Sequence, residues 1–202
     1  MAGEKTTRRT QRERSEATTS EVIAAARKLF AEAGYAATSL DAIAAAAGMT
    51  KGAIYHHFPS KQEVFRAVYE QERQRLSEME QAAYSRKRDP WDGFIAACLA
   101  FLEASADPEV QRITLLDAPG ALGWETIREM FVRDDLRTMV AALEAAMAAG
   151  RLRKRPVEPI AHLLHGAMGE SAMLIAHAKD QRAALRTASA EVRRLLEAVA
   201  SA

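Results

Sequence analysis

The amino-acid sequence predicts an all-α fold, and three observations support this prediction. Apolar side chains recur three and four positions apart through most of the chain, which is the spacing of one face of a helix. No stretch shows the sustained alternation of a β-strand, and no internal repeat is found. Capping residues and glycines separate the helical patterns. With 202 residues, 49% of them hydrophobic, the chain can form one large domain or a small domain joined to a larger one.

Residues 1–18 are predicted to form a flexible basic arm. They are polar, show no apolar periodicity, and carry the basic residues Lys5, Arg8, Arg9, Arg12 and Arg14. A segment with so few apolar side chains cannot bury enough surface to fold alone.

The first helix is predicted to begin near residues 18–21, where Thr18 and Glu21 have the spacing of a capping box. Gly34 ends it, because the residue after a helix end often needs a positive φ, and Tyr35 supplies the hydrophobic contact that favours such an end. The buried face of this helix consists of Val22, Ile23, Ala26, Leu29, Phe30 and Ala33.

Residues 40–58 are predicted to form two short helices joined by a tight turn. Thr38 and Asp41 can form a capping box at the start of the first helix, and Gly48 ends it. Thr50 can cap the second helix. The small Ala44, with Gly48 four residues on and the apolar Ile54 six further, has the spacing of a helix-turn-helix, whose second helix lies in the major groove of DNA.

Three segments around this motif resemble the DNA-binding domain of the tetracycline-repressor (TetR) family of transcription regulators. They are LFAEAGYAATSLDAIAAAAG, MTKGAIYHHF and PSKQEVF. The resemblance covers residues 22–68, less than a quarter of the chain. It implies a DNA-binding domain, here placed at residues 19–66, followed by a helical effector-binding and dimerisation domain at residues 67–202.

Several residues are predicted to contact DNA. Thr50 would contact a phosphate at the helix N-terminus, and Lys51 a guanine edge or a phosphate. Gly52 would let the backbone approach closely. The full predicted set is Thr38, Thr50, Lys51, Gly52, Ala53, Tyr55, His56 and Lys61.

Four of these residues have a more specific expected contact or an alternative role. Ala53 would touch a thymine methyl unless it is buried. Tyr55 and His56 match contacting positions of the family, although Tyr55 could instead pack within the hairpin. Lys61 follows a capping box at Ser60 and Glu63, and the resemblance gives it a phosphate contact, the alternative being a solvated lysine.

The distribution of charge agrees with a nucleic-acid-binding N-terminus but is too small to prove it. Residues 1–75 hold 12 Lys and Arg against 9 Asp and Glu, whereas the rest hold 16 against 18. The basic arm could follow the DNA backbone, or serve equally well as a solubilising tail. The single cysteine, Cys98, excludes an intramolecular disulfide. No apolar run is long enough to cross a membrane and the polar N-terminus is no signal peptide, so a cytoplasmic protein is expected.

The second domain is predicted to be a series of helices. They cover about twenty residues from position 64, then residues 90–106, 108–117, 122–149, 159–178 and 181–200. Residues 118–120 are expected to break the chain, and the basic residues 86–88 to form a solvated loop.

The last two helices are predicted to form a dimer interface. Apolar residues on the last helix alternate spacings of three and four, as a seam between helices requires. A twofold partner is also needed if each recognition helix reads one half-site. The alternative is that these residues bury in their own core. The predicted interface consists of Leu164, Ala167, Leu185, Ala188, Val192, Leu195 and Val199.

The middle helices carry aromatic and sulfur-containing residues of the kind that line small-molecule cavities, although such residues also form ordinary cores. The predicted ligand-binding residues are Phe94, Phe101, Trp124, Phe131, His165 and Met168. His162 and His165 share a helix face, but two histidines without a third close ligand make a weak metal site, so neither a metal nor a cofactor is predicted.

These observations predict a repressor that binds a pseudo-palindromic operator as a homodimer and is released by a small, largely apolar effector. The sequence carries no nucleophile elbow and no phosphate-binding glycine loop, which disfavours an enzyme with a vestigial DNA-binding domain. A DNA-binding architectural protein without an effector is a second alternative.

Overall fold

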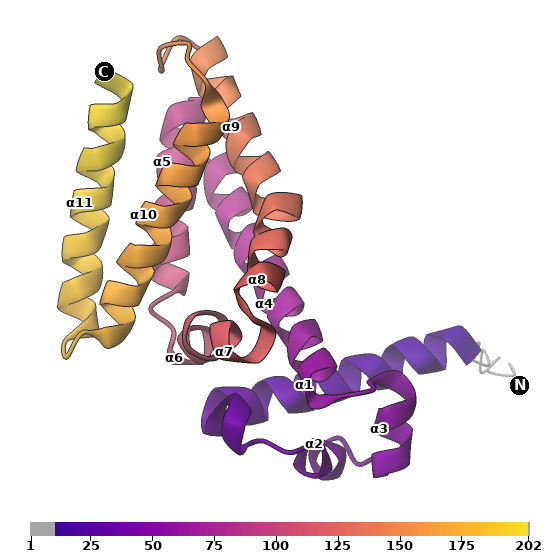
Figure 1. Cartoon of the computed structure of the whole chain (residues 1–202). Coiled ribbons are helices and arrows are strands. Elements are labelled where there is room, and N and C mark those ends of the chain that lie inside the picture. Colours follow the sequence, from indigo (N-terminus) through magenta and orange to yellow (C-terminus); the bar gives the residue numbers. More distant parts are fainter. Residues whose placement is uncertain (1–10, 202) are drawn as a thin grey trace, which may run out of the picture. The chain divides into compact units, whose positions relative to one another are not determined.

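The computed structural model describes residues 11–201, and these residues divide into two compact units, of which the first ends at Val68 and the second begins at Tyr69. Each unit is helical, and no strand occurs in the described part of the chain, so the predicted all-α fold is confirmed (Figure 1). None of the described helices is both long and apolar enough to span a bilayer.

The first unit contains α1 (Gln11–Ala37), α2 (Leu40–Ala46), α3 (Lys51–His57) and the start of α4 (Lys61–Ser85). Its core is formed by fully buried side chains from all four helices, among them Val22, Phe30, Ile43, Ile54 and Phe65. The rings of Phe30 and Phe65 meet edge to face, with their centroids 5.1 Å apart. This core fixes α2 and α3 against α1.

The prediction for the basic arm is wrong where the structure can test it. Helix α1 begins at Gln11, so residues 11–18 are helical rather than part of a flexible arm. Residues 1–10, with Lys5, Arg8 and Arg9, lie outside the described residues. The predicted end of the helix is partly right, because Gly34 has φ 81° and interrupts the helical backbone there.

The turn between α2 and α3 follows the predicted chemistry with one correction. Gly48 has φ 67°, a backbone conformation in which a residue with a side chain would be strained. The Thr50 hydroxyl caps α3 by accepting a hydrogen bond from the Ala53 amide at 3.2 Å. At the start of α2, however, the capping residue is Ser39, which accepts from the Ala42 amide at 3.1 Å. Thr38 was the wrong choice, because its side chain is turned into the core.

The second unit is a helical bundle. It contains the rest of α4, then α5 (Pro90–Ala104), α6 (Pro108–Val110), the π-helix η1 (Gln111–Asp117), α7 (Ala118–Leu122), α8 (Trp124–Met130), the π-helix η2 (Phe131–Asp135), α9 (Leu136–Ala148), α10 (Val157–His177) and α11 (Gln181–Ser201). Helices α5, α9, α10 and α11 share one core, and Figure 1 shows α10 and α11 side by side. Gly93 permits a close approach of α5 to α4, since a Cβ there would lie 3.0 Å from the Tyr84 ring.

Two predicted helices are more irregular than expected. The predicted break at residues 118–120 is wrong, because Pro119 lies in the first turn of α7, where its missing N–H costs nothing. The predicted helix over residues 122–149 begins after Gly123, at φ 81°, and widens into η2 before α9. Such π-segments are frequent at functional sites, and η2 carries two carboxylates to the wall of the cavity described below.

Candidate nucleic-acid interface and effector cavity

Helix α3 presents most of the predicted DNA-contacting residues to solvent. Ile54 is fully buried and anchors the helix, whereas Lys51, Gly52, Tyr55 and His56 are exposed. Tyr55 has 46% of its surface exposed, so the alternative that it packs within the hairpin does not hold. Ala53 and Thr50 also lie at or near the surface: Thr50 is exposed and Ala53 is half-buried.

Gly52 leaves open space where a side chain would be. A Cβ built on it would meet no atom within 4 Å, so the fold does not require glycine at this position. The backbone there is free to approach a partner closely.

Lys51 is held by an ion pair with the first turn of α2. Its ammonium lies 2.9 Å from Asp41 Oδ1 and 3.0 Å from Oδ2, and this hydrogen bond raises the pKa of Lys51. Both side chains are more than half exposed, so the pair contributes little stability. The pair holds the ammonium of Lys51 beside the first turn of α2.

Two of the predicted DNA-contacting residues form contacts within the first unit. Thr38 is 4% exposed, and its hydroxyl donates to the carbonyl of Gly34 at 2.8 Å. Its side chain is therefore not available to DNA, which corrects that prediction. Lys61 donates to the Tyr35 carbonyl at 2.8 Å, and its ammonium lies 4.2 Å from the centre of the Tyr35 ring. It is thus not a freely solvated lysine but joins the start of α4 to the end of α1.

A cavity of about 750 Å³ lies inside the second unit, within the range of small-molecule sites. Its walls come from α4, α5, η2, α9 and α10. Of the predicted ligand-binding residues, Phe94, Phe101, His165 and Met168 line it.

The other two predicted ligand-binding residues are elsewhere, which corrects those predictions. Phe131 is buried behind the wall, where its ring stacks on that of His165 with centroids 3.6 Å apart. Trp124 is 70% exposed at the first position of α8, directly after Gly123, where a φ of 81° separates α7 from α8. Periodicity identifies an apolar side chain but not the face of the bundle to which it turns.

The cavity also has ionisable groups on its wall that were not among the predicted ligand-binding residues. Burial, with the nearby charge of Asp135, raises the pKa of Glu80 to about 7. Burial raises the pKa of the Cys98 thiol to about 12 and lowers the pKa of His165. The signal was present in the sequence, because Glu80 lies one helical turn after the buried Leu76, on the apolar face of α4.

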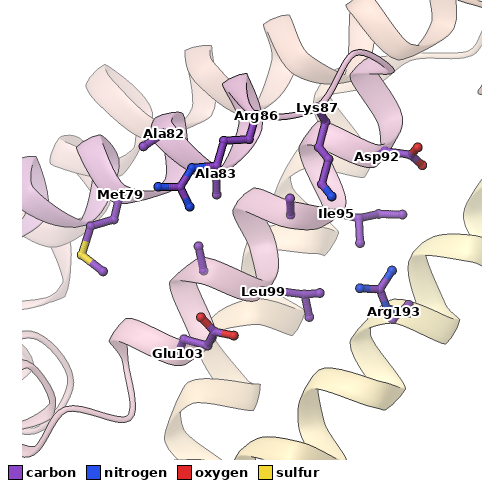
Figure 2. Close-up of a pocket in the computed structure, with 12 residues that line it drawn as sticks. Met79, Ala82, Ala83, Arg86, Lys87, Asp92, Ile95, Leu99, Glu103 and Arg193 are labelled. Carbon is purple, nitrogen blue, oxygen red and sulfur yellow. The ribbon is translucent and has the colours of Figure 1, made fainter.

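A second hollow, of about 660 Å³, lies between α4, α5 and α11 (Figure 2). Figure 2 shows short apolar side chains such as Ala83, Ile95 and Leu99 along it. Charged groups, including Arg86, Glu103 and Arg193, also line it, and it differs from the cavity that contains Glu80 because none of its lining residues is aromatic.

The predicted dimer interface is only partly on the surface. Leu164 and Val192 are 5% exposed and belong to the core of their own unit, which corrects their assignment. Leu185, Ala188 and Val199 pack partly against the same core, while Ala167 is half-buried and Leu195 is exposed. The most exposed apolar side chains of α10 lie outside the predicted set: Leu163 is 74% exposed and Leu174 is 62% exposed.

The sequence matches two family models. Residues 22–68 match the bacterial regulatory proteins of the tetR family, and residues 91–199 match the tetracyclin repressor-like C-terminal domain. A solved TetR-family transcriptional regulator from Pectobacterium atrosepticum is 34% identical, with a TM-score of 0.81, over 95% of this chain and 97% of that chain. The Transposon Tn10 TetC protein of Escherichia coli is 28% identical over 159 residues, 77% of this chain and 79% of TetC. RolR, solved in complex with resorcinol, shares the fold at 17% identity and a TM-score of 0.69, over 95% of this chain and 96% of RolR.

A helix-turn-helix unit joined to a second helical unit that contains a cavity is an arrangement typical of transcription regulators. The chain belongs to the TetR family of bacterial transcriptional regulators, whose members bind DNA and are not enzymes.

Proposed function

We propose that this regulator represses transcription by binding a pseudo-palindromic operator as a homodimer, and that a small, largely apolar effector releases it. The observation that carries the proposal is the exposed face of α3, which presents Lys51, Tyr55 and His56 around the open position at Gly52. A short helix with exposed N-terminal side chains, supported by a second helix, suits the major groove. Operator DNA as the partner implies that the protein works in the bacterial cytoplasm.

In this proposal the residues of α3 contact DNA either through their side chains or by letting the backbone approach. Lys51, Tyr55 and His56 reach base edges or phosphates, and Gly52 with the half-buried Ala53 allows the backbone to come close. Thr50 contacts a phosphate. Lys61 has two further N–H groups beside the one it gives to Tyr35, and one of these is proposed to bind a phosphate at the groove edge.

The dimer is proposed to form through α10 and α11. The exposed Leu163 and Leu174 lie eleven residues apart on α10, close to three helical turns, so they share one face. On α11, Leu195 is exposed as well. Apolar side chains of this size, unpaired within the chain, favour a self-complementary twofold contact. The exposed part of Ala167 would let two copies of α10 approach closely.

Effector release is proposed to act through α4. This helix carries Lys61, which is bonded to the end of α1, and also Glu80 and Tyr84, which line the cavity. An effector can shift the protein away from DNA only if it binds better to the arrangement that does not fit the operator. The cavity volume is sufficient for such a ligand.

Selection of random-sequence DNA by the purified full chain, followed by sequencing at one fixed salt concentration, tests the proposal. An inverted repeat with half-sites about one helical turn apart is the expected product. Salt-sensitive binding without sequence preference would instead favour an architectural role. A folded protein that retains no DNA would refute the proposal.

A further inference from the structure

Glu80 is a carboxylic acid without a partner on the wall of the larger cavity. It comes from α4 and is partly buried among the cavity-lining residues. Within the described residues its carboxyl group forms neither a hydrogen bond nor an ion pair, and burial together with Asp135 raises its pKa to about 7. A carboxylate in such a place is stabilised strongly by a cation that enters with its own hydrogen-bond donors.

The arginines near Glu80 pair with other carboxylates or lie in solvent. The guanidinium nitrogens of Arg73 lie 2.5 Å from Asp135 Oδ2 and 3.7 Å from Asp134 Oδ2. A guanidinium nitrogen of Arg133 lies 2.9 Å from Asp134 Oδ2. Arg137, on α9, is exposed to solvent. Arg133 and Arg137 lie on the cavity wall, but neither forms an ion pair with Glu80, and the charge of Arg73 offsets only part of the effect that burial and Asp135 have on the pKa of Glu80.

The remaining titratable groups of the walls carry no positive charge at neutral pH. The thiol of Cys98, on α5, has a pKa raised to about 12, and the pKa of His165, on α10, is lowered by burial. Tyr84, on α4, supplies a phenol. Asp134 and Asp135 on the same wall are paired with arginines, so Glu80 is the carboxyl group of the lining that is left for a ligand.

The rest of the lining suits the body of an organic cation rather than a metal ion. Aromatic rings come from Tyr84, Phe94 and Phe101, and thioethers from Met139 and Met168. Aromatic faces attract ammonium groups, and thioethers pack against apolar or aromatic surfaces. In the part of the chain that is described, no group of three or more histidine, cysteine or acidic residues gathers to hold a metal.

We infer that the cavity takes a small organic cation, a protonated amine on an apolar or aromatic body, whose charge meets the carboxylate of Glu80. The inference rests on the proposed function, in which this cavity receives the effector, and it narrows the effector from an apolar ligand to an amphipathic cation. A neutral ligand would gain only a hydrogen bond from Glu80. A carboxylate ligand would be repelled by it.

Three probes of one shape separate these possibilities: 4-phenylbutylamine, 4-phenylbutan-1-ol and 4-phenylbutyrate. Their affinities for the full-length protein are measured by calorimetry at pH 8. We expect the amine to bind roughly 10- to 100-fold more tightly than the alcohol, because a charged hydrogen-bonded pair is added, and more tightly still than the acid.

The pH dependence gives a second readout. The amine stays protonated between pH 6 and pH 8, whereas Glu80 becomes mostly protonated at pH 6. The amine should therefore bind about tenfold more weakly at pH 6, while the affinity of the alcohol should not fall.

Substitutions at Glu80 link the preference to this residue. Glu80→Gln should abolish both the preference for the amine and its pH dependence, whereas Glu80→Asp, which keeps the charge, should retain a weaker preference. Glu103→Gln is the matched control, because Glu103 lies on α5 but lines the other hollow (Figure 2). Thermal melts establish that each variant is folded.

Equal affinity for the amine and the alcohol overturns the inference. A preference for the amine that survives in Glu80→Gln also overturns it, and so does a failure of the amine to bind at millimolar concentration. Release of the selected operator is measured separately. If the protein binds its operator normally but does not bind the amine, only the inference that the ligand is a cation is refuted. An amine that binds as expected but leaves the operator in place refutes effector release and not the ligand class.

Discussion

The unpartnered carboxyl group of Glu80 predicts that replacing it will stabilise the protein in a pH-dependent way. In the unfolded chain the carboxyl group has a pKa of 4.5, and in the folded protein burial raises it to about 7. The folded state therefore binds the proton more tightly. As pH rises from 4.5 to about 7, the carboxyl group ionises in the unfolded state before it ionises in the folded state. The unfolded state is stabilised relative to the folded state, and the free energy of unfolding falls.

The size of the effect follows from the two pKa values. Each pH unit between them corresponds to about 1.4 kcal/mol, which gives about 3 kcal/mol at pH 8. Glu80→Gln keeps the shape of the side chain and removes the ionisation. We therefore expect the variant to match the wild type near pH 4.5 and to exceed it by about 3 kcal/mol at pH 8, a rise of roughly 6–12 °C in melting temperature.

Thermal unfolding followed by circular dichroism, in the absence of ligand, measures this difference. The other carboxyl groups titrate in both proteins, so their contributions cancel when the variant is compared with the wild type at each pH. The control Glu103→Gln should show no such divergence, because Glu103 is exposed. A difference between Glu80→Gln and the wild type that stays constant from pH 4.5 to pH 8, or a variant less stable at pH 8, would refute the reasoning.

Three further predictions concern the other parts of the site. Lys61→Met removes the hydrogen bond to the end of α1 and should lower the free energy of unfolding by about 1–2 kcal/mol in urea denaturation; an unchanged stability would mean that this bond is not formed in solution. Gly52→Ala should fold as well as the wild type, because a Cβ there meets nothing, yet bind the operator roughly tenfold more weakly in fluorescence anisotropy; unchanged affinity would show that the backbone does not approach DNA at this position. The double variant Leu163→Lys with Leu174→Lys should sediment as a monomer while Leu116→Lys, an exposed leucine of η1, stays dimeric; a double variant that remains a dimer would place the interface elsewhere.

Local signals in the sequence were enough to predict the helix-turn-helix. A positive φ at Gly48, a capping hydroxyl at Thr50 and burial of Ile54 depend on residues within a few positions of one another. The choice between Thr38 and Ser39 as the cap of α2 was not local. Both residues can cap a helix, and the contact of Thr38 with the end of α1 decides between them.

In the second unit, the sequence predicted helices better than it predicted their faces. Adjacent residues of a helix differ by about 100° in direction, so the rotation of α10 about its own axis decides that Leu163 is exposed while its neighbour Leu164 is buried. That rotation is set by how α10 packs against α9 and α11, which a single sequence does not specify. The raised pKa of Glu80 was missed for a related reason, because it depends first on burial between packed helices and then on Asp135, which is distant in the sequence.

The central claim, that a twofold dimer reads two half-sites, is tested most directly by changing the distance between them. The affinity of the full chain is measured for its selected inverted repeat and for the same repeat with about five base pairs inserted at the centre, which moves one half-site to the opposite side of the duplex. We expect the insertion to reduce the affinity to that of a single half-site. Equal affinity for the two duplexes would contradict the account.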